Sequence, residues 1–239
     1  MAAQLKTRRI LGGIVVFALA ILSVTGCGGG QAPTPGGQVF IPDAGQVVTP
    51  VGKPDARLGL TWISSFYVGD ELAQNNPARE QDAVRAGATW DRWPFERGQI
   101  PRTGGVFVFD HDNIGYTAAL DHDQSNGLNT LAIINGPVPN PSAPDLDDWR
   151  AYVEAIVTTY GDQADAWEIG NEWGLPHQPD LSAESYVNIL RTTCEVLYEH
   201  GQGDKPILLG SPEFPTALFS EEGLYYDHWI RVLELIYTD

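Results

Sequence analysis

Basic residues are scarce in this sequence. Only 14 Lys and Arg stand against 31 Asp and Glu, and the formal net charge is −17. This balance argues against a nucleic-acid partner, because phosphates are bound mainly by Lys and Arg. Cysteine is scarce too, with only Cys27 and Cys194. Cys194 lies between apolar positions of a predicted helix (Leu190, Leu197), which favours a place in the core over a role as nucleophile.

The N-terminal apolar run is short. Residues 10–24 carry no charge, but a membrane-spanning helix needs about 20 apolar residues. Preceded by Lys6, Arg8 and Arg9, the run fits the apolar core of a signal peptide. It closes on Val-Thr-Gly-Cys27, which resembles the lipobox of bacterial lipoproteins. We therefore expect a signal peptide over 1–26 and a lipid on Cys27 that anchors an exported protein to the outer face of a bacterial membrane. The alternatives are an ordinary signal peptide or a membrane anchor.

Residues 27–55 are rich in Gly and Pro and show neither a helical nor a strand period. Such a segment buries too little apolar surface to fold, so it predicts a tether between the membrane and a folded domain. The remaining residues, 56–239, are enough for one core but short for two domains.

Several common site motifs are missing. There is no phosphate-binding loop and no dinucleotide fingerprint, and Gly28-Gly29-Gly30 follows no strand. The five histidines lack metal-site spacing, and Asp110, Asp112, Asp121 and Asp123 are better explained as helix caps and solvated surface than as a calcium loop. No cofactor or metal is therefore implied.

The folded part repeats one pattern, in which a short apolar run alternates with an amphipathic stretch. Asp145 and Ser182 can each cap a helix, and glycines at 87, 127, 161 and 201 can end four helices. This alternation predicts successive βα units around a parallel sheet. The predicted strands are 58–63, 89–95, 128–135, 166–171 and 207–210.

Two α/β architectures fit this pattern. A (β/α)₈ barrel needs about 250 residues, so five units would make this chain a partial barrel, incomplete at its C-terminal end. A five-stranded doubly wound sheet is the alternative. The last helix candidate spans 224–237, with an inward face predicted for Tyr225, Trp229, Ile230, Leu233 and Ile236.

The most informative segment is Ala-Trp-Glu168-Ile-Gly-Asn171-Glu172-Trp173-Gly over 166–174. Acidic residues are depleted from strands, and a buried carboxylate costs free energy unless it is hydrogen-bonded. Ligands bind at the C-terminal ends of parallel strands, where Asn171 and Glu172 are predicted to lie. The alternative is that Glu172 simply caps a loop in solvent.

This segment resembles the fourth-strand motif of clan A glycoside hydrolases, the superfamily of cellulases, β-xylosidases and β-glucosidases. The segment 87–96, Gly-Ala-Thr-Trp-Asp-Arg-Trp-Pro-Phe-Glu, resembles the second strand of that family, and 207–211 follows in the order of its fifth. The resemblance covers about 58–239. It implies that Glu172 is the catalytic acid/base, that Asn171 binds the 2-hydroxyl of the sugar, and that Arg92 supports the catalytic carboxylates.

Retaining hydrolysis needs a second carboxylate about 5–5.5 Å from the acid. Glu168 lies four residues before Glu172, or ~13 Å along a strand, so we expect it to bind Arg92 or another interior polar group instead. Glu96 and Glu213 match no catalytic position of the family. Its nucleophile ends strand seven, which is not among the five predicted strands, so the resemblance implies a chain without the nucleophile.

Aromatic rings at strand ends are candidate platforms for sugars, and the candidates are Trp62, Trp90, Trp93 and Trp173. The first three can equally be core or rim packing, whereas Trp173 is favoured as a platform because it is next to the acid. The sequence thus predicts an anchored β-glycosidase of the retaining type, acting on β-linked oligo- or polysaccharides. One alternative is a non-catalytic carbohydrate-binding lipoprotein. The other is a solute-binding lipoprotein with a doubly wound sheet.

Overall fold

The computed structural model describes residues 58–68, 77–138, 140–173, 181–210 and 222–238. The predicted signal peptide, the tether, the lipidation site at Cys27 and Glu213 lie outside these residues, so what was expected of them stays a prediction. Within the described ranges, no helix combines the length and the apolar character that crossing a bilayer requires.

A five-stranded parallel sheet organises the chain. All five predicted strands are present, with bounds that differ by a few residues. Their order in the sheet is their order in the sequence: β1 (Gly59–Thr61), β2 (Trp90–Glu96), β7 (Asn129–Asn135), β8 (Ala166–Ile169) and β9 (Ile207–Leu209).

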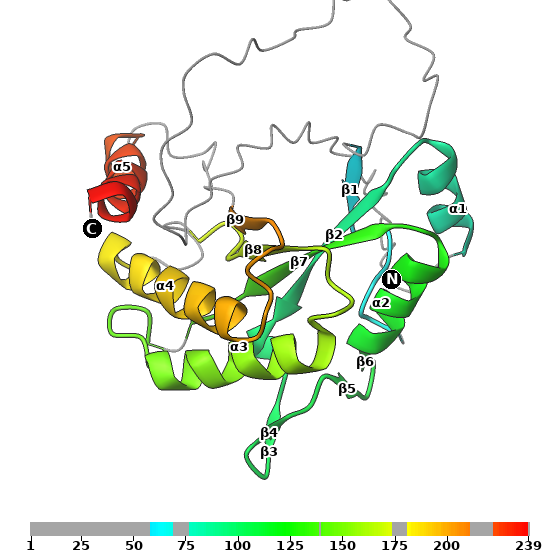
Figure 1. The fold of residues 1–239 in the computed structure, drawn as a ribbon, viewed down its shortest axis with the longest axis horizontal. Coiled ribbons are helices and arrows are strands. Elements are labelled where there is room, and N and C mark those ends of the chain that lie inside the picture. Colours follow the sequence, from blue (N-terminus) through cyan, green and yellow to red (C-terminus); the bar gives the residue numbers. More distant parts are fainter. Residues whose placement is uncertain (1–57, 69–76, 139, 174–180, 211–221, 239) are drawn as a thin grey trace, which may run out of the picture.

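This strand order decides between the two architectures. In a doubly wound sheet the order reverses at a switch point, which places helices on both faces. Here each new strand adds to the same edge, and right-handed crossovers then place every connecting helix on one face. Figure 1 shows α2, α3 and α4 in an arc along one side of the sheet. The sheet is singly wound, as in part of a (β/α)₈ barrel, and the doubly wound alternative is wrong.

The helices fall where the glycine and capping pattern predicts. They are α1 (Pro77–Arg85), α2 (Tyr116–Ser125), α3 (Leu146–Tyr160), α4 (Ala183–Glu199) and α5 (Glu222–Thr238). Gly87, Gly127 and Gly201 follow the ends of α1, α2 and α4 with positive φ angles, which glycine adopts without steric cost. Gly161 caps α3 in the right-handed conformation.

The connection from β2 to α2 is more elaborate than the sequence predicts. It contains the short 3₁₀ helix η1 (Arg97–Gln99) and two small antiparallel pairs, β3–β4 and β5–β6. The four strands are β3 (Arg102–Thr103), β4 (Val106–Phe107), β5 (Asp110–His111) and β6 (Ile114–Gly115). Strands of two residues carry no readable period, which is why the sequence did not reveal them.

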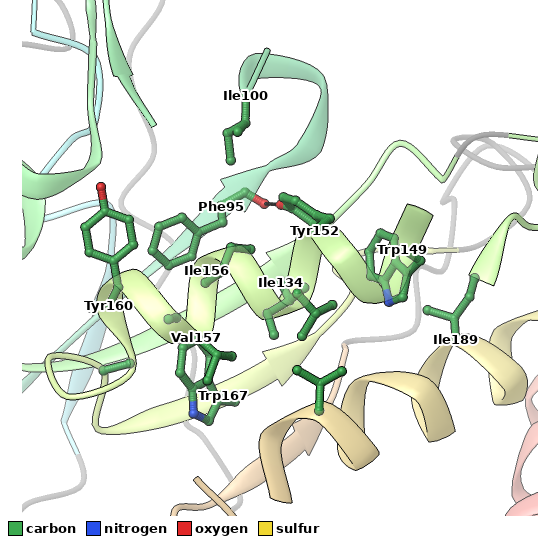
Figure 2. Close-up of a cluster of buried hydrophobic side chains, with 14 of the residues drawn as sticks. Phe95, Ile100, Ile134, Trp149, Tyr152, Ile156, Val157, Tyr160, Trp167 and Ile189 are labelled. Atoms are coloured by element: carbon green, nitrogen blue, oxygen red, sulfur yellow. Dashed lines mark hydrogen bonds between the residues drawn. The ribbon is translucent and has the colours of Figure 1, made fainter. Parts of the chain in front are cut away.

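The main core fills the space between the sheet and its helices. Large aromatic side chains dominate it, among them Trp149 of α3 and Trp167 of β8, and Figure 2 shows Tyr152 and Tyr160 of α3 on either side of Phe95 of β2. Their polar atoms largely find partners: the Tyr152 hydroxyl donates to the Phe95 carbonyl at 2.8 Å, and Trp149 Nε1 donates to Thr193 Oγ1 at 2.9 Å. Trp167 Nε1, by contrast, is buried without a hydrogen-bond partner among the described residues. Burying the α3 rings with their polar groups bonded stabilises the register of α3 on the sheet.

Asp145 is the N-cap of α3, as predicted, and its carboxylate accepts from the backbone N–H groups of Asp147 and Asp148 at 3.1 and 3.0 Å. We expect Asp145→Ala to lower the free energy of unfolding by about 1 kcal/mol, because two N–H groups lose their acceptor. Urea unfolding of the variant measures this. Asp204→Ala, in an exposed turn, is the control and should change stability by less than about 0.5 kcal/mol; equal losses in both variants would contradict the cap.

One prediction about α5 is wrong. Ile230 and Leu233 were expected to face inward, but their side chains are exposed, whereas Val232 is fully buried and Trp229 and Ile236 are partly buried. Among the described elements α5 packs mainly on α4. Since one neighbouring helix covers only part of a helix surface, the apolar stripe read from the sequence is wider than the face that is buried.

A pair of buried carboxyl groups joins β2 to α2. Asp91 accepts from the backbone N–H groups of Ile63 and Ser64 at 2.9 and 2.5 Å. Asp123 accepts from Trp93 Nε1 at 3.0 Å and from the Thr130 hydroxyl at 2.7 Å. Burial raises the pKa of both carboxyls, and the neighbouring Asp123 charge raises the pKa of Asp91 further. The folded pair therefore retains a proton that the unfolded chain releases.

This pair predicts a pH dependence of stability. Its contribution is fully present below the unfolded pKa of about 3.9 and is lost as pH rises through the raised pKa of the folded pair, by ~1.4 kcal/mol for each pH unit between the two values. Asp123→Asn keeps an oxygen for Trp93 and Thr130 and gives Asp91 an amide donor. We expect this variant to gain stability relative to the wild type between pH 4 and pH 8 in urea unfolding. Parallel pH profiles for the two proteins would contradict the shared proton.

Candidate functional site

Polar side chains gather at the C-terminal ends of β2, β7 and β8. Side chains alternate along a strand, so Arg92 and Glu96 lie on the face of β2 opposite to Trp93 and Phe95, which are buried against the helices. Glu96 is paired in register with Asn135, the last residue of β7. We call this end of the sheet the mouth, because in a barrel it is where ligands enter.

The guanidinium of Arg92 is the centre of the hydrogen-bond network at the mouth. Its Nε donates to Glu168 Oε2 at 2.7 Å, and its Nη2 donates to Glu168 Oε1 at 2.6 Å and to Asn171 Oδ1 at 2.7 Å. The side chains of Arg92 and Glu168 are only 19% and 5% exposed. A carboxylate so buried needs a charged, bidentate partner. The expectation that Glu168 binds Arg92 is confirmed.

Asn135 links this ion pair to the turn that follows β8. Its Oδ1 accepts from the backbone N–H of Asn171 at 3.1 Å and from Trp173 Nε1 at 2.7 Å, while its Nδ2 donates to Glu96 Oε1 at 3.0 Å. Sequence reasoning did not identify Asn135 as a site residue. The sequence does carry a signal for it: a polar residue ending a buried apolar strand, like Asn171 after β8.

The turn after β8 has an unusual backbone. Gly170 has φ 74°, and a Cβ at this position would approach the Trp173 ring to 2.6 Å, so only glycine fits. Glu172 has φ 53°. A non-glycine residue in the left-handed region is uncommon and often marks a functional site. The turn leaves the Glu172 side chain exposed at the mouth.

Three of the four predicted sugar platforms are not exposed at the mouth. Trp93 is fully buried on the helix side of the sheet, where it binds Asp123. Trp173 is 3% exposed and packs edge-on against Trp149 and Tyr186. Trp90 is the first residue of β2, at the end of the strand opposite to the mouth.

Trp62 is the platform candidate that the structure leaves accessible. It directly follows β1, is 38% exposed, has φ 64°, and packs on Phe66 with ring centroids 5.3 Å apart. Its backbone N–H donates to the Arg92 carbonyl at 3.1 Å, which ties this residue to β2. A sugar-binding role for Trp62 stays a prediction.

Glu96 is a further carboxylate at the mouth. Burial raises its pKa, opposed by the hydrogen bond from Asn135. Its backbone N–H donates to the Tyr116 hydroxyl at 2.9 Å. Burial raises the pKa of Tyr67 as well, and the nearby Glu96 charge adds to that shift. Unlike Glu168, Glu96 forms no ion pair with a basic side chain within the part of the chain that the structure describes.

No protein-family model and no curated protein matches the sequence. Solved structures match in part. A family 5 lichenase from Caldicellulosiruptor sp. F32 is 14% identical over 75% of this chain and 58% of that one, with a TM-score of 0.47. Endoglucanase Cel5A from Thermotoga maritima is 18% identical over 69% and 54%, with a TM-score of 0.45. This chain is similar in fold to parts of glycoside hydrolases.

A family 39 glycoside hydrolase from Bacteroides cellulosilyticus WH2 also matches, at 14% identity and a TM-score of 0.42. That alignment covers 56% of this chain and 29% of the hydrolase. The chain thus spans between about a third and just over half of these glycoside hydrolases.

Proposed function

We propose that this chain carries the acid/base side of a retaining β-glycosidase site, with Glu172 as the general acid and then the general base. The observation that carries the proposal is the network at the mouth, in which Arg92 holds Glu168 and Asn171 while Asn135 holds the backbone of the same turn. Rigidly held polar groups at the ends of parallel strands are what catalysis on a bound ligand requires.

The orientation of Asn171 supports a role in sugar binding. Arg92 is a pure donor, so the Asn171 atom that faces it is the amide oxygen. The Asn171 Nδ2 amino group then points away from Arg92 and, with no acceptor among the described residues, can donate to a sugar oxygen. If that oxygen is the 2-hydroxyl, as the resemblance implies, the sugar would be placed with its glycosidic oxygen near Glu172, which protonates it.

In the proposed reaction Glu172 protonates the glycosidic oxygen as the bond to the anomeric carbon breaks, and later takes a proton from the attacking water. The second carboxylate would attack the anomeric carbon from the opposite side of the ring. Glu168 is unsuited to that role because both its oxygens are bound by Arg92. The resemblance assigns the role to a glutamate at the end of a seventh strand, beyond the five strands described here.

Sugar binding without catalysis is the second candidate. The exposed Trp62 beside the mouth would serve either function. We also propose that a lipid on Cys27 attaches the protein to a membrane. This attachment would place either activity outside the cytoplasm.

The full-length product of the gene, assayed on 4-nitrophenyl β-glycosides, tests the proposal. We expect release of nitrophenol and, by proton NMR of the first sugar formed, retention of the β configuration. Inverted product would contradict the mechanism. Saturable binding of β-linked oligosaccharides without any hydrolysis would favour the second candidate.

A further inference from the structure

We propose that Glu96 is the polar anchor of a sugar subsite at the mouth, where one of its carboxylate oxygens accepts hydrogen bonds from sugar hydroxyls. The inference rests on the proposed function, because it assumes that the ligand at the mouth is a sugar. It goes beyond that function by assigning a binding residue from β2, and it predicts a preference for neutral over acidic sugars.

The position of Glu96 suits a ligand contact. It is the last residue of β2, four residues beyond Arg92 on the same face, and its side chain is partly exposed. Register pairing places it beside Asn135, whose Oδ1 holds the Asn171 backbone. Glu96 therefore belongs to the same layer of the mouth as the turn that carries Glu172.

Asn135 fixes the Glu96 carboxylate in one orientation. The backbone N–H of Asn171 and the indole N–H of Trp173 are both pure donors, so the Asn135 atom between them must be the amide oxygen. The amino group of Asn135 then necessarily faces Glu96 and binds its Oε1 at 3.0 Å. Only one carboxylate oxygen is used by this contact.

The other oxygen, Oε2, has no hydrogen-bond partner among the described residues. A carboxylate oxygen has room for two hydrogen bonds, and hydrogen bonds to charged groups are stronger than neutral ones. Glu168 shows the contrast, because Arg92 occupies both of its oxygens. Oε2 of Glu96 thus offers an oriented, anionic acceptor to hydroxyl donors.

The surroundings of Glu96 suit a sugar rather than a cation or an acid. The aromatic rings of Tyr67 and Phe66 pack together at 4.6 Å in the segment after β1, and the Glu96 charge reaches Tyr67. Since no described basic side chain pairs with Glu96, its negative charge is uncompensated. A uronic acid would meet like-charge repulsion, whereas a neutral sugar would not.

Calorimetric titration of the full chain with methyl β-D-glucopyranoside and methyl β-D-glucuronide tests the inference. Glu96→Gln is the key variant: its amide oxygen can still accept from Asn135, while its amino group replaces the free acceptor by a donor. We expect the variant to bind the glucoside about ten- to a hundredfold more weakly, the effect of losing a charged acceptor. Its affinity for the glucuronide should rise. Glu195→Gln, on the exposed face of α4, is the matched control and should change the affinity for neither sugar.

The opposite directions for the two ligands separate the inference from a folding defect, because a damaged protein would lose affinity for both. Unchanged affinities in Glu96→Gln would overturn the inference, as would a wild-type chain that binds neither sugar. Failure of the proposed function looks different: Glu96→Gln then changes binding as expected, while Glu172→Gln leaves hydrolysis unchanged.

Discussion

We expect Glu172→Gln to lower the kcat/KM for hydrolysis of an alkyl or phenyl β-glycoside by about 10²- to 10⁴-fold, the range that a general acid contributes. Glutamine has the same shape but no proton to give, so the glycosidic oxygen must leave as an alkoxide. The turn that carries residue 172 is held by the Asn135 bond to the Asn171 backbone and by Arg92 on the Asn171 side chain. Neither contact uses the Glu172 carboxyl, and thermal unfolding of the variant measures whether the fold is retained.

The identity of the leaving group provides the control. A 2,4-dinitrophenyl glycoside needs little protonation, so bond cleavage in Glu172→Gln should be far less impaired with this substrate. Glu154→Gln, on α3, is the control variant and should leave the hydrolysis of both substrates unchanged. A loss of kcat/KM of the same size for both substrates would contradict the acid role, and unchanged kcat and kcat/KM for both would exclude Glu172 from catalysis altogether.

Arg92→Met should lower the free energy of unfolding by about 3–5 kcal/mol, the cost of breaking a buried ion pair on one side. Methionine fills much of the volume but leaves the Glu168 carboxylate, 5% exposed, without its two donors. Asn171 loses its partner as well. Urea unfolding followed by tryptophan fluorescence measures the loss, and any hydrolytic activity should fall with it because the turn is no longer held.

Arg150→Met is the matched control. Arg150 forms ion pairs with Glu154, Glu195 and Glu199, more partners than Arg92 has, but these glutamates are 41–63% exposed. Exposed ion pairs contribute about 0–1 kcal/mol each at most. If Arg150→Met costs as much as Arg92→Met, then burial of the Arg92–Glu168 pair is not what makes it important.

Much of the fold could be predicted from the sequence because its signals are local. Asp145 and Ser182 cap the helices that they were predicted to cap, and Gly87, Gly127 and Gly201 end three helices in the expected conformation. Strand positions followed from short apolar runs between these signals. Such patterns depend on the backbone preferences of a few neighbouring residues, which the sequence displays directly.

The candidate site was only half predictable. Glu168 was expected to bind Arg92 or another interior polar group, since a buried carboxylate costs free energy unless it is hydrogen-bonded. The tryptophans were not predictable in the same way, because adjacent strand positions face opposite sides of a sheet. Trp93 is adjacent to Arg92 in the sequence, yet its side chain points into the helix layer. Trp173 is buried, and its indole N–H donates to Asn135.

By itself the sequence determined the alternation of strands and helices, the places where helices start and stop, and the presence of Glu172 after a strand with a buried acid. Only the tertiary structure decided the order of the strands, and with it a singly wound sheet instead of a doubly wound one. Only it brought together Glu96 and Asn135, from the ends of two strands, and Asn171, from the turn after a third. The physical reason is that helix caps and strand periods arise between near neighbours in the chain, whereas strand order and amide orientation arise from contacts between residues far apart in the sequence.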